Sequence, residues 1–329
     1  MSSATFATTR PCRSLRTRSA VSLRCSKRRE RMGGSITTPA CSKVSPRSDA
    51  PVPTLSSLRG PRSSGTTPGL VIAGLDSSVP RPALDPAIEI RPGTDVDDVW
   101  QRFEIFEALH HSMQICNPMT SAELDEVIEA TEPDAGHHVV DMACGYGEVL
   151  FRMAAQRDIN GTGVDLSPWM IASAADQTPV RAPNGTLQWV LGEARDYFPV
   201  HASDIAVCIG AEWVWHDFSG TAKALAARLA PGGVAVIGAA RLHTAADADL
   251  VRSERGAVET IDDQRNLLAA HGLVPMHRVD PDDAGWDAYL ARTAQAAADW
   301  AVAYPGPRAD RWIEEQADWQ AARERDRDV

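Results

Sequence analysis

An alternation of short apolar strands with helical stretches begins after Gly136, and it constrains the fold more than any other feature of the chain. Strands are predicted near residues 138–143, 161–166, 187–192, 204–210, 233–239 and 273–279, and helices near 147–157, 168–176, 220–229 and 259–271. This order is typical of a mainly parallel sheet with helices on both faces. The sequence therefore predicts an α/β fold with a doubly wound sheet.

The first predicted strand runs into a glycine-rich turn within VVDMACGYGE, residues 139–148. Asp141 lies in this strand, and Gly145 and Gly147 would let a ligand approach the backbone where a Cβ would clash. A dinucleotide-binding fingerprint would place a third glycine at position 150, which is Leu150. This difference disfavours a nicotinamide-dependent oxidoreductase.

The second predicted strand ends in Asp165, within GTGVDLSPWM. A carboxylate at this position can accept two hydrogen bonds from the diol of a ribose. Alternatively, Asp165 caps a helix that begins at Ser167 and Pro168, since proline is favoured at a first helical position. The two roles are compatible in one residue.

With these two segments the chain resembles the class I S-adenosylmethionine-dependent methyltransferases of the small-molecule type, which are Rossmann-like. The family's glycine-rich first motif matches Asp141 to Gly147, and its second-strand acid matches Asp165. Its adenine contact, its cleft-lining fourth-strand motif and its fifth-strand entry match Gly192-Glu193-Ala194, Ile209 to Trp215 and Leu225 to Gly238. The five motifs occur in the family's order.

The resemblance implies an enzyme that binds S-adenosyl-L-methionine and transfers its methyl group to a small-molecule acceptor by in-line displacement. The first motif would hold the amino-acid end of the cofactor, Asp165 the ribose hydroxyls, and Glu193-Ala194 the adenine. The helix that carries Met113, Cys116 and Asn117 would close over the cofactor. The expected cofactor-binding residues are Asp141, Ala143, Cys144, Gly145, Gly147, Asp165, Leu166, Glu193, Ala194 and Gly210. Cys144 is interpreted as a packed thiol and not as a nucleophile.

A catalytic base is sought in the stretch after the fourth strand. His216 is the candidate, because it titrates near neutral pH, and Trp213 and Trp215 could form an apolar wall for a planar acceptor. His110 and His111 are rivals on the helix expected to close the cleft. Alternatively, His216 is a solvated loop residue, because methyl transfer can proceed by positioning alone.

The charge is divided unevenly along the chain. Residues 1–70 hold 13 of the 33 lysines and arginines but only two acids, Glu30 and Asp49, although the whole chain has a net charge of −11. The remaining body is therefore strongly acidic and poorly suited to a nucleic-acid backbone. No apolar run approaches the roughly 20 residues needed to span a membrane. The six cysteines form no CxxC pair, so no metal site or disulfide framework is predicted and a cytoplasmic location is expected.

Four segments are predicted. Residues 1–80 are an Arg/Ser/Pro-rich leader expected to be disordered, and either a transit peptide or a misassigned start in a GC-rich genome would explain it. Residues 81–135 form a helical cap over the cofactor site, with a capping box at Thr120 and Glu123. Residues 136–280 form the methyltransferase core, and residues 281–329 form C-terminal helices.

The C-terminus departs from the family pattern. The family sheet has a seventh, antiparallel strand after the last helix, but the chain from Trp319 onward is highly charged. Either this strand is missing or it is supplied otherwise. We expect six strands, with the tryptophan-bearing helices over the gap and a homodimer as one outcome of the exposed edge. A missing strand also favours the alternative function, a non-catalytic S-adenosylmethionine-binding or regulatory domain.

Overall fold

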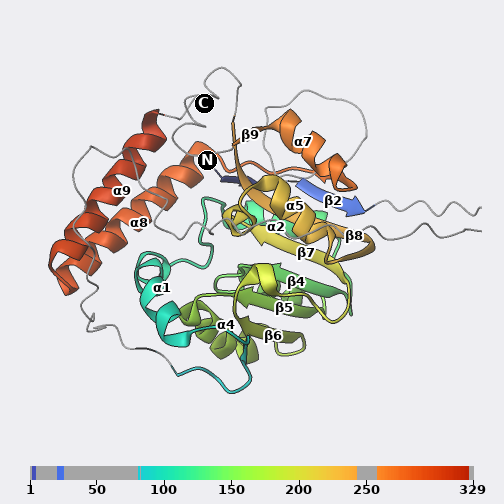
Figure 1. Ribbon diagram of the computed structural model, residues 1–329, viewed down its shortest axis with the longest axis horizontal. Coiled ribbons are helices and arrows are strands. Elements are labelled where there is room, and N and C mark those ends of the chain that lie inside the picture. Colours follow the sequence, from blue (N-terminus) through green and yellow to red (C-terminus); the bar gives the residue numbers. More distant parts are fainter. Residues whose placement is uncertain (1, 5–20, 26–80, 82, 243–257, 326–329) are drawn as a thin grey trace, which may run out of the picture. The chain divides into compact units, whose positions relative to one another are not determined.

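A computed structural model describes residues 2–4, 21–25, 81, 83–242 and 258–325 (Figure 1). These residues lie in one of two units of the chain, residues 1–27 with 77–329, whereas the other unit, Arg28–Asp76, lies outside the described residues. The six predicted strands are β4 (His138–Met142), β5 (Asn160–Asp165), β6 (Thr186–Leu191), β7 (Ser203–Ile209), β8 (Leu229–Leu242) and β10 (Leu273–His277). The four predicted helices are α3 (Glu148–Gln156), α4 (Pro168–Arg181), α5 (Phe218–Ala226) and α7 (Ile261–Ala270). The predicted α/β fold is confirmed.

The sheet has the order β10-β2-β8-β7-β4-β5-β6-β3, where β3 is Glu89–Ile90 and pairs parallel to β6. From β4 the chain builds outward through β5 and β6, and then returns to the other side of β4 as β7 and β8. Parallel crossovers are right-handed, so this reversal puts the two sets of helices on opposite faces. The reversal also creates a switch point between β4 and β7, where ligands bind in open α/β sheets.

The position between β8 and β10 is filled by a strand from the N-terminal leader. This strand, β2 (Val21–Cys25), pairs antiparallel to both neighbours, and β1 (Ser2–Ala4) pairs antiparallel to β8 farther along. Within the leader the structure thus describes these two segments as strands, and the rest of residues 1–80 lies outside the described residues. Of the two alternatives given above, a missing strand or one supplied otherwise, the second holds, because β2 takes this place in the sheet.

The helical cap consists of α1 (Val96–His110) and α2 (Ser121–Ala130). The predicted capping box is present, since the Thr120 side chain accepts from the Glu123 amide and the Glu123 carboxylate accepts from the Thr120 amide. Helix α1 packs against α4, where Trp100 and Trp169 meet edge to face with 4.5 Å between ring centroids. It ends at His110, so Met113, Cys116 and Asn117 lie in the loop after the helix and not on it.

The two C-terminal helices are α8 (Asp283–Ala303) and α9 (Pro307–Arg325), which pack against each other and cover α1 (Figure 1). A small second core joins Ile105 and Leu109 of α1 to Ala296 and Ala297 of α8, with Trp300 and Trp312 packed on it. The expectation that the tryptophan-bearing helices cover a gap in the sheet is wrong. They cover the cap instead, because the leader strand already fills that gap.

Among the described residues, no helix is both long and apolar enough to cross a membrane.

Candidate functional site

Two buried carboxylates face the same loop at the carboxyl end of the sheet. Asp141, in β4, is 3 % exposed, and Asp165, at the end of β5, is 8 % exposed. Burial raises the pKa of both, and the negative charge of Asp165 raises that of Asp141 further. Neither carboxylate has an ion-pair partner within the part of the chain that the structure describes. Such a pair favours a positively charged ligand.

Asp165 also organises the glycine turn. Its Oδ2 accepts from the Gly145 amide at 2.8 Å and its Oδ1 accepts from the Ser167 amide at 2.8 Å. Ser167 itself caps α4, and Pro168 occupies the first helical position as predicted. A carboxylate has about four lone-pair sites, so Asp165 can accept further hydrogen bonds from a ribose. The alternative that Asp165 caps this helix is wrong, because Ser167 is the N-cap of α4 and Asp165 accepts from the amide of that cap residue.

The turn between β4 and α3 uses three residues with left-handed backbone. Ala143, Gly145 and Gly147 have φ values of 59°, 55° and 74°. A Cβ on Gly147 would lie 2.2 Å from the Trp189 ring, so this glycine is required by packing as well as by φ. The Cys144 thiol is packed beside Gly163, and burial raises its pKa well above the usual value, in keeping with its interpretation as a packed thiol.

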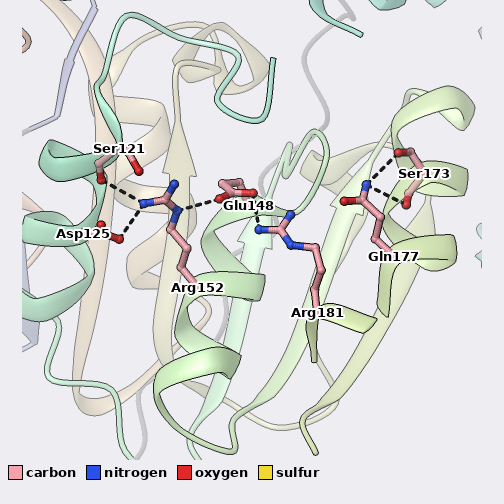
Figure 2. Close-up of polar contacts among 7 residues, drawn as sticks. All are labelled: Ser121, Asp125, Glu148, Arg152, Ser173, Gln177 and Arg181. Atoms are coloured by element: carbon pink, nitrogen blue, oxygen red, sulfur yellow. Dashed lines mark hydrogen bonds and ion pairs between the residues drawn. The ribbon is translucent and has the colours of Figure 1, made fainter. Parts of the chain in front are cut away.

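The first turn of α3 is held by a charged network behind the site (Figure 2). Glu148 is buried and pairs with Arg152 at 2.7 Å and with Arg181 of α4 at 2.7 Å. Arg152 continues to Asp125 of α2 at 2.7 Å and to the Ser121 carbonyl. These contacts tie α2, α3 and α4 together, and they fix the helix onto which the glycine turn leads.

The predicted adenine end lies beside the ribose end. The Gly192 amide donates to the Asp165 carbonyl at 2.9 Å, so Glu193 and Ala194 follow directly at the neighbouring strand end. Leu166, next to Asp165, is half-buried. The structure therefore brings the expected cofactor-binding residues of β4, β5 and β6 to one edge of the sheet.

Gly210, after β7, has a φ of 73°, and a Cβ there would meet Asn117 at 3.8 Å. The loop after α1 thus lies over the end of β7. Cys116 in the same loop is close enough to Asp165 for that carboxylate to raise its pKa. This places Cys116 and Asn117 near the ends of β5 and β7, and their closing over the cofactor stays a prediction.

A second polar group of residues, which the sequence reasoning missed, joins the cap to the glycine turn. The Tyr146 phenol donates a hydrogen bond to the Glu107 carboxylate of α1. Burial raises the pKa of Glu107, although the Tyr146 hydrogen bond and His111 oppose this. The only sequence signal was a glutamate among the aromatic residues of the cap helix, and no local pattern indicates that it meets Tyr146.

His216 follows β7 as predicted, but its side chain is exposed and its φ is 77°. Trp213 is 57 % exposed, and the Trp215 ring lies 5.5 Å from the Arg228 guanidinium. Arg228 donates to the carbonyls of residues 194, 195 and 197, so Trp215 faces that loop. Trp213 and Trp215 therefore lie in different environments and do not form the predicted apolar wall together.

Comparisons with known proteins agree with this geometry. Residues 139–233 match the family model described as a methyltransferase domain. The uncharacterized protein YjhP of Escherichia coli (strain K12) is 27 % identical over 217 residues, which cover 63 % of this chain and 85 % of that protein.

Two crystal structures of S-adenosylmethionine-dependent methyltransferases, each in complex with S-adenosyl-L-homocysteine, are similar to the chain. The protein from Thiobacillus denitrificans has a TM-score of 0.61 at 25 % identity, covering 68 % of this chain and 93 % of that one. The protein from Geobacter sulfurreducens has a TM-score of 0.62 at 24 % identity, with the same coverage. Together with the buried acids and the glycine turn, these findings identify residues 139–233 as a methyltransferase domain, and the fold as that of the class I, Rossmann-like, S-adenosylmethionine-dependent methyltransferases.

Proposed function

We propose that this enzyme transfers a methyl group from S-adenosylmethionine to a small-molecule acceptor. The observation that carries the proposal is the buried pair Asp141 and Asp165, which has no ion-pair partner among the described residues and lies beside the left-handed glycine turn. The cofactor carries an ammonium group and a sulfonium, so it supplies the positive charge that two buried carboxylates favour. The strongly acidic body of the chain supports a small molecule rather than a nucleic acid as acceptor.

When bound, the cofactor supplies a methyl group on a positively charged sulfur, which is already a good leaving group. The residues of the chain bind and orient. Asp141 and the turn at Ala143, Cys144, Gly145 and Gly147 hold the amino-acid end. Asp165, with Leu166 beside it, accepts from the ribose hydroxyls, and Glu193-Ala194 borders the adenine. Gly210 lies at the end of β7 under the loop that carries Asn117, and this loop would help to exclude water from the reacting atoms.

His216 stays the base predicted from the sequence. The place of His216 after β7 supports the prediction. Its exposure weakens the prediction, because a general base must face the bound acceptor inside the cleft. Positioning alone remains the alternative role of this site.

The alternative of a non-catalytic cofactor-binding domain rested on a missing strand. The strand position is filled by β2, so that observation no longer favours it. The prediction of a homodimer was based on the same missing strand. It stays a prediction, but the filled strand position no longer supports it. We propose a cytoplasmic location, which the free thiols Cys116, Cys144 and Cys208 support.

The test has two stages. Calorimetry measures binding of S-adenosylmethionine and S-adenosylhomocysteine, and we expect saturable binding of both. A metabolite extract is then incubated with the protein and isotopically labelled S-adenosylmethionine, and mass spectrometry follows the label. Binding without any labelled product would favour the non-catalytic alternative, and absence of binding would refute the cofactor assignment.

A further inference from the structure

Glu107, Tyr146 and Cys116 form a polar cluster on the cap side of the cofactor site. The Tyr146 phenol donates to Glu107, and Tyr146 belongs to the glycine turn itself. Burial raises the pKa of the Cys116 thiol, and the negative charges of Asp165 and Glu107 raise it further, so both carboxylates are near enough to act on this thiol. The cluster therefore reaches from the expected ribose site to the cap helix.

A second pair, His110 of α1 and Tyr289 of α8, lies next to this cluster. The Nδ1 of His110 lies 2.8 Å from the Phe106 carbonyl, which can only accept, so Nδ1 carries a proton. Burial lowers the pKa of His110, and the Nε2 of the neutral ring accepts from the Tyr289 phenol at 3.0 Å. His110 thus has both ring nitrogens engaged and is not free to take a proton. His111, the other rival, is exposed, and its Nδ1 lies 2.9 Å from the Ala108 carbonyl. Glu107 is the cap residue whose carboxylate is hydrogen-bonded to the glycine turn, through Tyr146.

The groups that face Glu107 are Tyr146 from the turn, Cys116 from the loop, and His111 from its own helix. Tyr146, Cys116 and Tyr289 all have their pKa values raised by burial, so they remain neutral near pH 7. Asp165 and Glu107 are then the acidic groups near the glycine turn that act on Cys116. Two carboxylates on this side of the turn attract a protonated nitrogen and repel an anion.

We propose that Glu107, held by the Tyr146 phenol beside the cofactor site, binds the ammonium group of a small amine acceptor and takes its proton before methyl transfer. This assignment rests on the proposed methyltransferase function and names the acceptor class. It places the proton acceptor on the cap helix instead of at His216.

The step balances as follows. The ammonium N–H bond breaks and its proton moves to a Glu107 carboxylate oxygen, which leaves a lone pair on the nitrogen. That lone pair forms the new N–C bond to the methyl carbon as the S–C bond breaks, and the electron pair of the S–C bond stays on sulfur. The products are a methylammonium compound and the neutral thioether S-adenosylhomocysteine.

The experiment begins with binding of S-adenosylhomocysteine to the full chain by calorimetry. Failure at this stage refutes the proposed function and not this assignment. The saturated complex is then titrated with n-butylamine, n-pentylamine and n-hexylamine, and with alcohols and carboxylates of the same lengths. We expect amines to bind at least tenfold more tightly than the matched alcohols, and carboxylates more weakly than both.

Three variants assign this preference to its residue. Glu107→Gln keeps the shape but removes the charge, so it should lose the amine preference while S-adenosylhomocysteine affinity stays within about threefold. Tyr146→Phe should keep part of the preference, and Glu126→Gln, an exposed glutamate of α2, should keep all of it. An unchanged preference in Glu107→Gln, or no preference for amines in the unaltered complex, would overturn the assignment.

The labelled-methyl assay adds a readout of turnover. With any amine that accepts label, we expect Glu107→Gln to lower turnover by roughly 10²–10⁴-fold and Glu107→Asp to restore part of it. The acidic limb of the pH profile for turnover should disappear in Glu107→Gln. Labelling of alcohols or carboxylates in preference to amines would overturn the proposed acceptor class.

Discussion

At the scale of residues, the charged forms of Asp141 and Asp165 are disfavoured by their burial in the fold. Asp141 is buried next to Asp165 with no ion-pair partner among the described residues, and its pKa is raised by burial and by that neighbour. Functional sites commonly retain such unfavourable arrangements because the ligand relieves them. Binding and stability should therefore respond in opposite directions when this charge is removed.

The variant Asp141→Asn tests this expectation. Because the pKa of Asp141 is raised in the folded protein, folding favours the neutral form, and the charged form destabilises the fold above the folded-state pKa. We expect Asp141→Asn to raise the melting temperature of the ligand-free protein at neutral pH and to weaken S-adenosylmethionine binding. The gain in stability should vanish as the pH falls below the unfolded-state pKa. Calorimetry across pH measures both effects, and a less stable variant at neutral pH would contradict the argument.

Asp165 serves both the turn and the expected ribose site. Asp165→Ala should weaken S-adenosylmethionine binding by about 1.5–3 kcal/mol, the usual range for a hydrogen bond to a charged group. Because Asp165 also accepts from the Gly145 and Ser167 amides, the matched variant Asp165→Asn is needed, since it keeps one acceptor oxygen. Unchanged affinity in a folded Asp165→Ala variant would remove this residue from the cofactor site.

His216→Ala decides between the two candidate bases. If His216 takes the proton, turnover should fall by roughly 10²–10⁴-fold with intact cofactor affinity. Turnover within a few-fold of the unaltered enzyme, with Glu107→Gln inactive, is the result expected from the assignment to Glu107. The comparison requires an acceptor found by the labelling experiment.

At the scale of elements, the features that could be predicted from the sequence are those determined by residues close together in the chain. The apolar strands, the Thr120 capping box and the proline that begins α4 all have local signals, and all are present. The strand Val21–Cys25 was missed although VSLRC alternates apolar and polar residues, because it is only five residues long and lies within an Arg- and Ser-rich leader. Both of its partner strands also lie far away in the sequence. The contact between Glu107 and Tyr146 was missed for the same reason, because it depends on how α1 packs.

The turn that leads into α3 gives a prediction at this scale. Gly147→Ala should destabilise the protein by about 2–4 kcal/mol, since its Cβ would overlap the Trp189 ring in addition to the cost of a left-handed φ. Gly136→Ala is the matched control, because Gly136 has a φ of 81° with no atom within 4 Å of its Cβ. Denaturant unfolding compares the two, and equal losses would show that packing against Trp189 adds nothing.

At the scale of the whole molecule, the central sheet joins strands that are far apart in the sequence, since β2 near the N-terminus pairs with β10, the last of the described strands. β2 lies between β8 and β10, so its removal would leave the backbone groups of two strands without partners. A leader that is disordered throughout would be dispensable for stability, but residues 21–25 are part of the sheet and are expected to contribute to it.

Deletion of residues 1–27 should lower the melting temperature by several degrees, since a loss of about 1 kcal/mol shifts the midpoint by roughly 2–4 °C in a protein of this size. Leu23→Pro should act in the same direction, because it removes one amide from an interior strand. Replacement of residues 30–70 by a Gly/Ser linker of equal length is the control and should have little effect. Equal melting temperatures for all forms would mean that β2 contributes no stability.

The place of β2 also sets an order of events during folding. A ribosome makes β2 before every described strand except β1, yet its two partners, β8 and β10, are made late, and β10 is the last of the described strands to emerge. The earliest segment of the sheet is therefore the last to find its neighbours, and the search spans nearly the whole chain. Until then β8 exposes an unpaired edge, so the nascent protein passes through a stage that is open to aggregation and to chaperone binding.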